Sequence, residues 1–141
     1  MWPRTFAERL ESWQSLRHST VSSDIGTALA KINLWWFATP WSAYHLHWDD
    51  RADWPDPWQL LSDNHYCDLA RGLGILYTIT LLDRADLTSA ELVLTEEGDN
   101  LVLVEKLKYI LNWDKDTIVN TIQAVNIKKQ YTQEAVKKQY L

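Results

Sequence analysis

The 141-residue sequence is poor in cysteine, in basic residues and in long apolar runs. Its single cysteine, Cys67, has no partner within the chain, so a disulfide scaffold is excluded and a reducing compartment is favoured. The longest apolar run, residues 72–82, is about half of the roughly 20 residues that a membrane-spanning helix needs, and it predicts a buried element instead. The first residues do not show a basic segment followed by an apolar one, so we expect no signal peptide.

Positive charge is also in short supply. Fourteen basic against nineteen acidic residues give a net charge of -5, which argues against nucleic acid or an anionic membrane as a partner. The charge is uneven along the chain, since residues 48–70 sum to -5 and residues 117–141 sum to +3. The middle of the chain is therefore acidic and its C-terminal segment basic.

Common catalytic motifs are missing as well. The sequence has no glycine-rich phosphate loop, no Ser-His-Asp order typical of a hydrolase, and no basic-aromatic stripe for single-stranded nucleic acid. Neither internal repeats nor a long linker are visible. We therefore expect one domain, no cofactor and no enzymatic activity.

Apolar spacing predicts three helices in the first part of the chain. Residues 5–17 form an amphipathic helix that Thr5 caps, and residues 23–39 form a second helix that ends before Pro40. A third helix begins at Asp63 or Asn64 and runs to about Leu82, and its lack of a polar stripe places it at the centre of the fold. Between them we expect an extended segment at 41–48, a loop at 49–58 and one helical turn after it.

The second half predicts a small antiparallel sheet. Residues 92–94 and 101–104 flank a turn and form a hairpin, and residues 108–113 can add a third strand. The expected fold class is α+β, with N-terminal helices and a tryptophan-rich loop region around a central buried helix, followed by this sheet. The expected organisation is a globular domain over residues 1–127 and a polar C-terminal arm over residues 128–141.

Tryptophan is the most over-represented residue, with nine copies, six of them within residues 35–58. These side chains can staple a loop-rich half of the fold, or they can anchor a protein interface, where tryptophan supplies much of the binding energy. A third hypothesis is a glycan-binding module, in which the tryptophans and aspartates of the 41–58 loop contact a sugar. The partner-binding candidates in this region are Trp41, Trp48, Trp54 and Trp58.

The basic C-terminal arm is the second candidate interaction region. It is either a solvated, frayed end or a docking arm that becomes ordered on the acidic surface of a partner. The residues that would make these contacts are Lys128, Lys129, Tyr131, Lys137, Lys138 and Tyr140.

Cys67 is the candidate nucleophile, because it lies in the first turn of the central helix, where free amides and the helix dipole favour the thiolate. The segment DWPDPWQLLSDNHYCDLARGL, followed by a hairpin, resembles transglutaminase-like cysteine proteases. In those enzymes the histidine follows the cysteine, whereas all four histidines here precede Cys67. An enzyme would therefore need His45 or His47 as its base, and the alternative is a buried structural cysteine.

The same residues suggest a metal site, which we do not favour. His45 and His47 alternate on an extended segment, and His65 with Cys67 could complete a tetrahedral set. The spacing matches no common zinc module, and two helical residues two positions apart point in different directions. Histidines that donate hydrogen bonds explain the pattern equally well, so no metal is expected.

Two stretches carry a further resemblance, residues 32–82 and residues 90–121. Their recognisable pieces are Trp35-Trp36, WPDPWQLL, YCDLARGLGILYT and YILNW. They resemble small uncharacterised proteins of tailed bacteriophages, particularly of T4-like and cyanobacterial phages. The resemblance implies a virion component of the tail, baseplate or neck, assembled in the host cytoplasm, whose partners are other virion proteins in a symmetric assembly.

Overall fold

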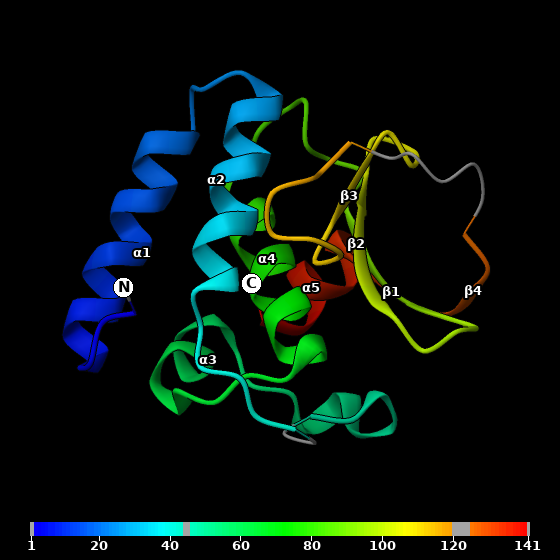
Figure 1. Cartoon of the computed structure of the whole chain (residues 1–141), viewed down its shortest axis with the longest axis horizontal. Helices are drawn as coiled ribbons and strands as arrows, with labels where there is room; N and C mark the ends of the chain where they lie inside the picture. Colours follow the sequence, from blue (N-terminus) through cyan, green and yellow to red (C-terminus); the bar gives the residue numbers. More distant parts are fainter. Residues whose placement is uncertain (1, 44–45, 120–124, 141) are drawn as a thin grey trace.

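The computed structural model describes residues 2–43, 46–119 and 125–140. The fold is α+β, as the sequence predicts. In Figure 1, α1 and α2 form an outer layer, α4 lies at the centre, and the sheet covers the opposite side. The elements in chain order are α1 (Phe6–Thr20), α2 (Ile25–Phe37), the 3-10 helix η1 (Trp48–Asp53), α3 (Pro57–Asp63), α4 (Asp68–Leu82), β1 (Glu91–Thr95), β2 (Asn100–Val104), β3 (Tyr109–Leu111), β4 (Ile127–Thr132) and α5 (Gln133–Tyr140).

The first two helices begin at side-chain caps. Thr5 accepts a hydrogen bond from the backbone N–H of Glu8, as predicted, and Asp24 does the same for Thr27. The second cap lies one residue after Ser23, where the prediction began the helix. Both helices turn one apolar side toward α4.

The segment between α2 and α4 contains more helix than predicted. The sequence predicted an extended segment at 41–48. In the structure, Trp41 forms an isolated β-bridge with Tyr66, and Trp48 is already the first residue of η1. Residues 48–53 are helical rather than loop. α3 begins at a capping box formed by Asp56 and Gln59, with Pro57 in its first turn.

The central helix α4 starts at Asp68, later than the predicted start at Asp63 or Asn64. Cys67 is its N-cap residue and has an extended conformation. The close packing of α4 against α2 requires a glycine at position 74. A Cβ at Gly74 would lie 2.4 Å from the indole ring of Trp36, so only glycine lets α2 approach this closely. The helix ends at Leu82, and the C-cap residue Asp83 adopts the left-handed conformation.

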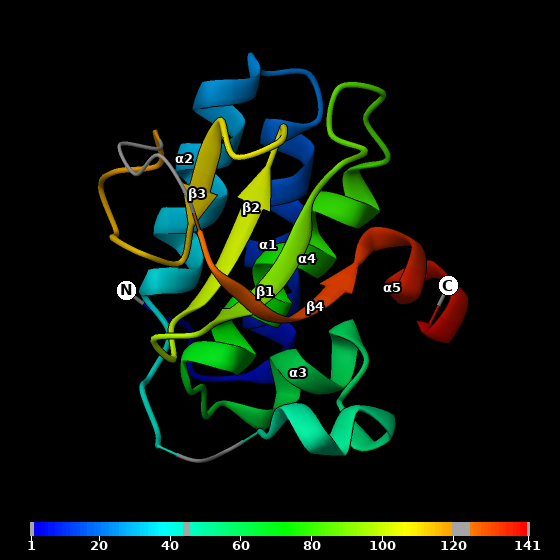
Figure 2. The same ribbon diagram turned by 90° about the vertical axis from the view of Figure 1, so that its right-hand side faces the viewer.

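The sheet is antiparallel, with the strand order β3-β2-β1-β4 (Figure 2). The predicted hairpin and third strand are present, and Leu92 pairs with Val102 in the hairpin. Side chains alternate between two faces, because Leu92 and Val102 face the main core while Val93 and Leu101 form a second cluster on the other side.

The predicted arm at 128–141 is part of the fold, which corrects the domain boundary at residue 127. β4 pairs with β1 along its length, and Figure 2 shows α5 continuing from it beside the sheet edge. Tyr131 and Val136 are buried in the main core. The segment is polar because an edge strand and a surface helix each bury only one side.

Candidate functional site

The two candidate binding sites are hollows on the surface. The first, which we call the Cys67 pocket, has a volume of about 370 Å³ and lies where α4 begins. The second, the α1–α2 groove, has a volume of about 480 Å³. The Cys67 pocket is lined by Trp41, Ala43, Leu46, His47, Trp48, Cys67, Asp68, Leu69 and Asn100. The α1–α2 groove is lined by Trp2, Pro3, Ser12, Leu16, Ser19, Lys31, Leu34, Trp35 and Ala38.

Cys67 is held at the start of α4 with its side chain turned toward the helix. Its Sγ accepts a hydrogen bond from the backbone N–H of Ala70 at 3.4 Å, and the residue is 9% exposed. His47 lines the same pocket, so the structure brings this predicted pair to one place. His45, the other predicted base, lies outside the described residues. His65 is exposed and does not line the pocket.

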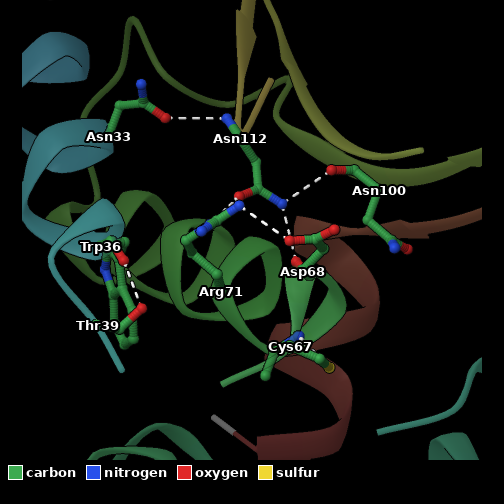
Figure 3. A network of polar contacts seen from close by, with 9 residues as sticks. Asn33, Trp36, Thr39, Cys67, Asp68, Arg71, Asn100 and Asn112 are labelled. Atoms are coloured by element: carbon green, nitrogen blue, oxygen red, sulfur yellow. Dashed lines mark hydrogen bonds and ion pairs between the residues drawn. The ribbon is translucent and has the colours of Figure 1, made fainter. Parts of the chain in front are cut away.

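A network of polar contacts ties the pocket to the sheet, with Asn112 at its centre (Figure 3). The Nδ2 atom of Asn112 donates to the backbone oxygens of Asp68 and Asn100, both at 2.8 Å. Its Oδ1 accepts from Nε of Arg71 at 2.6 Å. Its backbone N–H donates to Asn33 Oδ1 at 2.9 Å, which extends the network to α2. One side chain after β3 thus fixes the start of α4 relative to β2.

The guanidinium of Arg71 completes this network. It donates to Asp68 Oδ1 at 3.0 Å and stacks over the ring of Phe37, 4.0 Å from its centroid. Burial lowers the pKa of Arg71 from its usual value, while the neighbouring Asp68 carboxylate opposes that shift. The group stays charged at neutral pH, because arginine starts from a very high pKa.

The predicted tryptophan anchors differ in exposure. Trp41 is 65% exposed and Trp58 is also exposed, so both are available to a partner. Trp54 is buried, and its Nε1 donates to the backbone oxygen of His47 at 2.8 Å, so its assignment as a partner anchor is wrong. Trp48 is partly buried and bonded to Asn100. The tryptophans of residues 35–58 therefore mainly stabilise this half of the fold, while Trp41 and Trp58 remain exposed.

Three of the six predicted contact residues of the C-terminal segment interact within the chain. Tyr131 is buried, which raises its pKa to about 12, and Tyr140 donates to the backbone oxygen of Trp54, so neither is a free anchor. Lys129 Nζ lies 2.5 Å from Asp49 Oδ1 and lowers the pKa of that carboxylate. The exposed side chains that remain are Lys128, Lys137 and Lys138.

Comparisons with protein families, curated proteins and solved structures find no match. The function of the chain must therefore be inferred from its arrangement of side chains. Among the described residues, no three histidine, cysteine, aspartate or glutamate side chains gather in a way that could hold a metal ion. None of the helices in that part of the chain has the length and apolar character needed to cross a membrane.

The α1–α2 groove is the surface that sequence reasoning missed. Leu34 on α2 is 52% exposed, and Trp35 beside it is only partly buried. The Nε1 atom of Trp35 donates to Ser12 Oγ on α1 at 3.0 Å, and the ring of Trp2 packs edge-on against it at 4.8 Å. The missed signal was Leu34 itself, an apolar residue outside the predicted helical stripe.

Proposed function

We propose that this chain is a non-catalytic structural protein of a tailed-bacteriophage virion, in the tail, baseplate or neck, where repeated copies contact neighbouring subunits. The observation that carries the proposal is the α1–α2 groove, which holds about 480 Å³ between two helices and exposes Leu34 beside Trp35. A hollow with a mostly apolar lining, in which a leucine is exposed beside a tryptophan, is typical of the contact surface of a protein interface. Tryptophan and other large side chains in such hollows are the usual energetic centre of an interface.

The occupant of the groove, in this proposal, is an apolar segment of a neighbouring virion protein. The walls come from α1, α2 and the residues before α1, and the hydrogen bond between Trp35 and Ser12 holds the two helices together. A groove built on packed helices changes shape little on binding, which lowers the cost of association. The resemblance to phage proteins supports the same conclusion.

Leu34→Glu is expected to lower the number of copies incorporated per virion at least about tenfold, because a carboxylate buried in an interface costs several kcal/mol, which a pair with Lys31, one helical turn away, offsets only in part. The measurement is quantitative mass spectrometry of virions from a phage that lacks the gene and is complemented with each variant. The substitution leaves the fold intact, since Leu34 is 52% exposed.

The matched control for this variant is Val119→Glu, which makes a similar change at a residue that is 58% exposed and outside the groove. We expect it to enter virions at the wild-type level. Equal incorporation of Leu34→Glu and wild type would show that the groove contacts no subunit.

A second candidate function, a Cys67-dependent transglutaminase-like or cysteine-protease-like enzyme, is favoured by one observation. Cys67 Sγ accepts an N–H bond at the start of α4 in a pocket that His47 also lines. Such an enzyme needs a thiolate that reacts quickly at neutral pH.

Because Cys67 is nearly buried and we propose a structural role, its alkylation by iodoacetamide at pH 7 is expected to be slower than that of free glutathione. Mass spectrometry of the intact protein follows the reaction. Alkylation faster than that of glutathione, slowed by His47→Ala but not by His18→Ala on α1, would instead establish the enzyme and refute the structural proposal.

A further inference from the structure

The Cys67 pocket presents an aromatic surface to solvent. Trp41, at 65% exposure, is the most exposed large apolar side chain among the described residues, and it lines a hollow of about 370 Å³. Volumes of this order are typical of sites for small ligands. Because the Trp41 indole is mostly in solvent, it does not stabilise the core. Its place at this pocket is better explained by contact with a ligand.

The backbone around Trp41 is fixed before any ligand binds. The N–H of Ser42 donates to the backbone oxygen of Tyr66 at 2.9 Å, and the N–H of Tyr66 donates to that of Pro40 at 3.1 Å. On the other side of the pocket, Trp48 Nε1 donates to Asn100 Oδ1 at 2.8 Å. These bonds position Trp41 and Trp48 in the absence of a ligand, which lowers the cost of binding at these two residues.

Two polar groups with unused hydrogen-bonding capacity line the same pocket. Asp68 Oδ1 accepts from Arg71, while Oδ2 has no hydrogen-bond partner among the described residues. Asn100 Oδ1 accepts from Trp48, while its Nδ2 has no acceptor in that part of the chain. Figure 3 shows Asp68 and Asn100 close together beside the start of α4. The pocket therefore offers one acceptor and one donor next to an indole.

The charges around the pocket favour a neutral ligand. The described residues that line the pocket include no lysine or arginine that could bind an anion. A cation gains little from Asp68, because the Arg71 guanidinium already lies 3.0 Å from that carboxylate. A wholly apolar ligand would cover Asp68 and Asn100 without bonding to them, which is costly.

We propose that the Cys67 pocket binds a neutral saccharide. The apolar C–H face of one pyranose ring stacks on the indole of Trp41, and its hydroxyl groups donate to Asp68 and accept from Asn100. Sugars fit this site because each hydroxyl both donates and accepts while the ring carries an apolar face. The inference goes beyond the proposed virion role, since it assigns a ligand to a different surface from the α1–α2 groove.

The test begins with a glycan array probed with the fluorescently labelled full chain. We expect hits among neutral hexose or N-acetylhexosamine oligosaccharides, and titration of the intrinsic tryptophan fluorescence with the strongest hit gives its Kd. Trp41→Ala is expected to raise that Kd at least about tenfold, since stacking on an exposed indole is lost, and Asp68→Asn to raise it severalfold.

The matched control is Trp113→Ala, which removes an indole that is 44% exposed and does not line the pocket. Its Kd is expected to stay at the wild-type value. An array without neutral hits, hits confined to acidic glycans, or binding that survives Trp41→Ala would each overturn the proposal. Because Trp41 is mostly in solvent, loss of binding in its variant does not reflect unfolding.

Discussion

Replacing Thr78 by valine is expected to lower the free energy of unfolding by about 2–6 kcal/mol. Thr78 Oγ1 accepts from Nε1 of Trp13 at 2.9 Å and from Nε1 of Trp36 at 3.0 Å, and it donates to the backbone oxygen of Gly74. Valine has nearly the same shape but no acceptor. Two buried indole N–H groups would therefore lose their partner, and each such group costs about 1–3 kcal/mol.

The matched control is Thr80→Val on the same helix. Thr80 is also buried, but its hydroxyl donates only to the backbone oxygen of Leu76, at 2.7 Å, and receives no hydrogen bond from a tryptophan. We expect this change to cost less than about 1 kcal/mol. Urea unfolding followed by circular dichroism measures both variants, and equal losses would show that Thr78 does not hold the two indoles.

The second large effect is expected for Asn112→Gly, which should lower the free energy of unfolding by about 2–4 kcal/mol. The change removes the bonds to the backbone oxygens of Asp68 and Asn100 and to Nε of Arg71. Glycine is chosen because Asn112 has a φ of 68°, a conformation in which glycine is not strained. The loss therefore reports on the side-chain network.

Asn64→Gly is the control for this variant. Asn64 has a similar φ of 58°, but its side chain accepts one hydrogen bond, from Trp2 at 2.8 Å. We expect it to cost about 1 kcal/mol or less. Because the network fixes the start of α4, Asn112→Gly should also speed the reaction of Cys67 with a thiol reagent. A variant as stable as Asn64→Gly, with unchanged thiol reactivity, would show that Asn112 does not organise the pocket.

The sequence predicted the elements whose signal is local. The spacing of Leu10, Trp13 and Leu16 and the cap at Thr5 gave α1, and the turn around Gly98 gave the hairpin of β1 and β2. These patterns depend on residues within one or two turns of each other. The α+β class followed from them.

The C-terminal strand could not be predicted in this way. β4 carries Lys128 and Lys129 on a sheet edge and buries Tyr131, so its own pattern is that of a polar tail. Its stability comes from β1, about 40 residues earlier in the chain, through pairs such as Leu92 with Tyr131. Pairing over such a distance leaves no local signal.

The candidate site was predicted only in part, for the same reason. Cys67 and Trp41 stood out by residue type, and the structure places both on one pocket. The Asn112 network joins residues from α2, α4, β2 and the end of β3, and an asparagine has no residue-type signal for such a role. The α1–α2 groove exists only because two helices pack with Leu34 turned outward.

The most direct test of the account is whether the chain is part of the virion. The proposed function places the gene in a tailed phage, and purified particles of that phage, separated on a density gradient and analysed by quantitative mass spectrometry, give the number of copies per particle. We predict a fixed copy number that matches a symmetric assembly and that persists after high-salt washing, because the lining of the α1–α2 groove is mostly apolar. Complete absence from washed particles would contradict the proposed function.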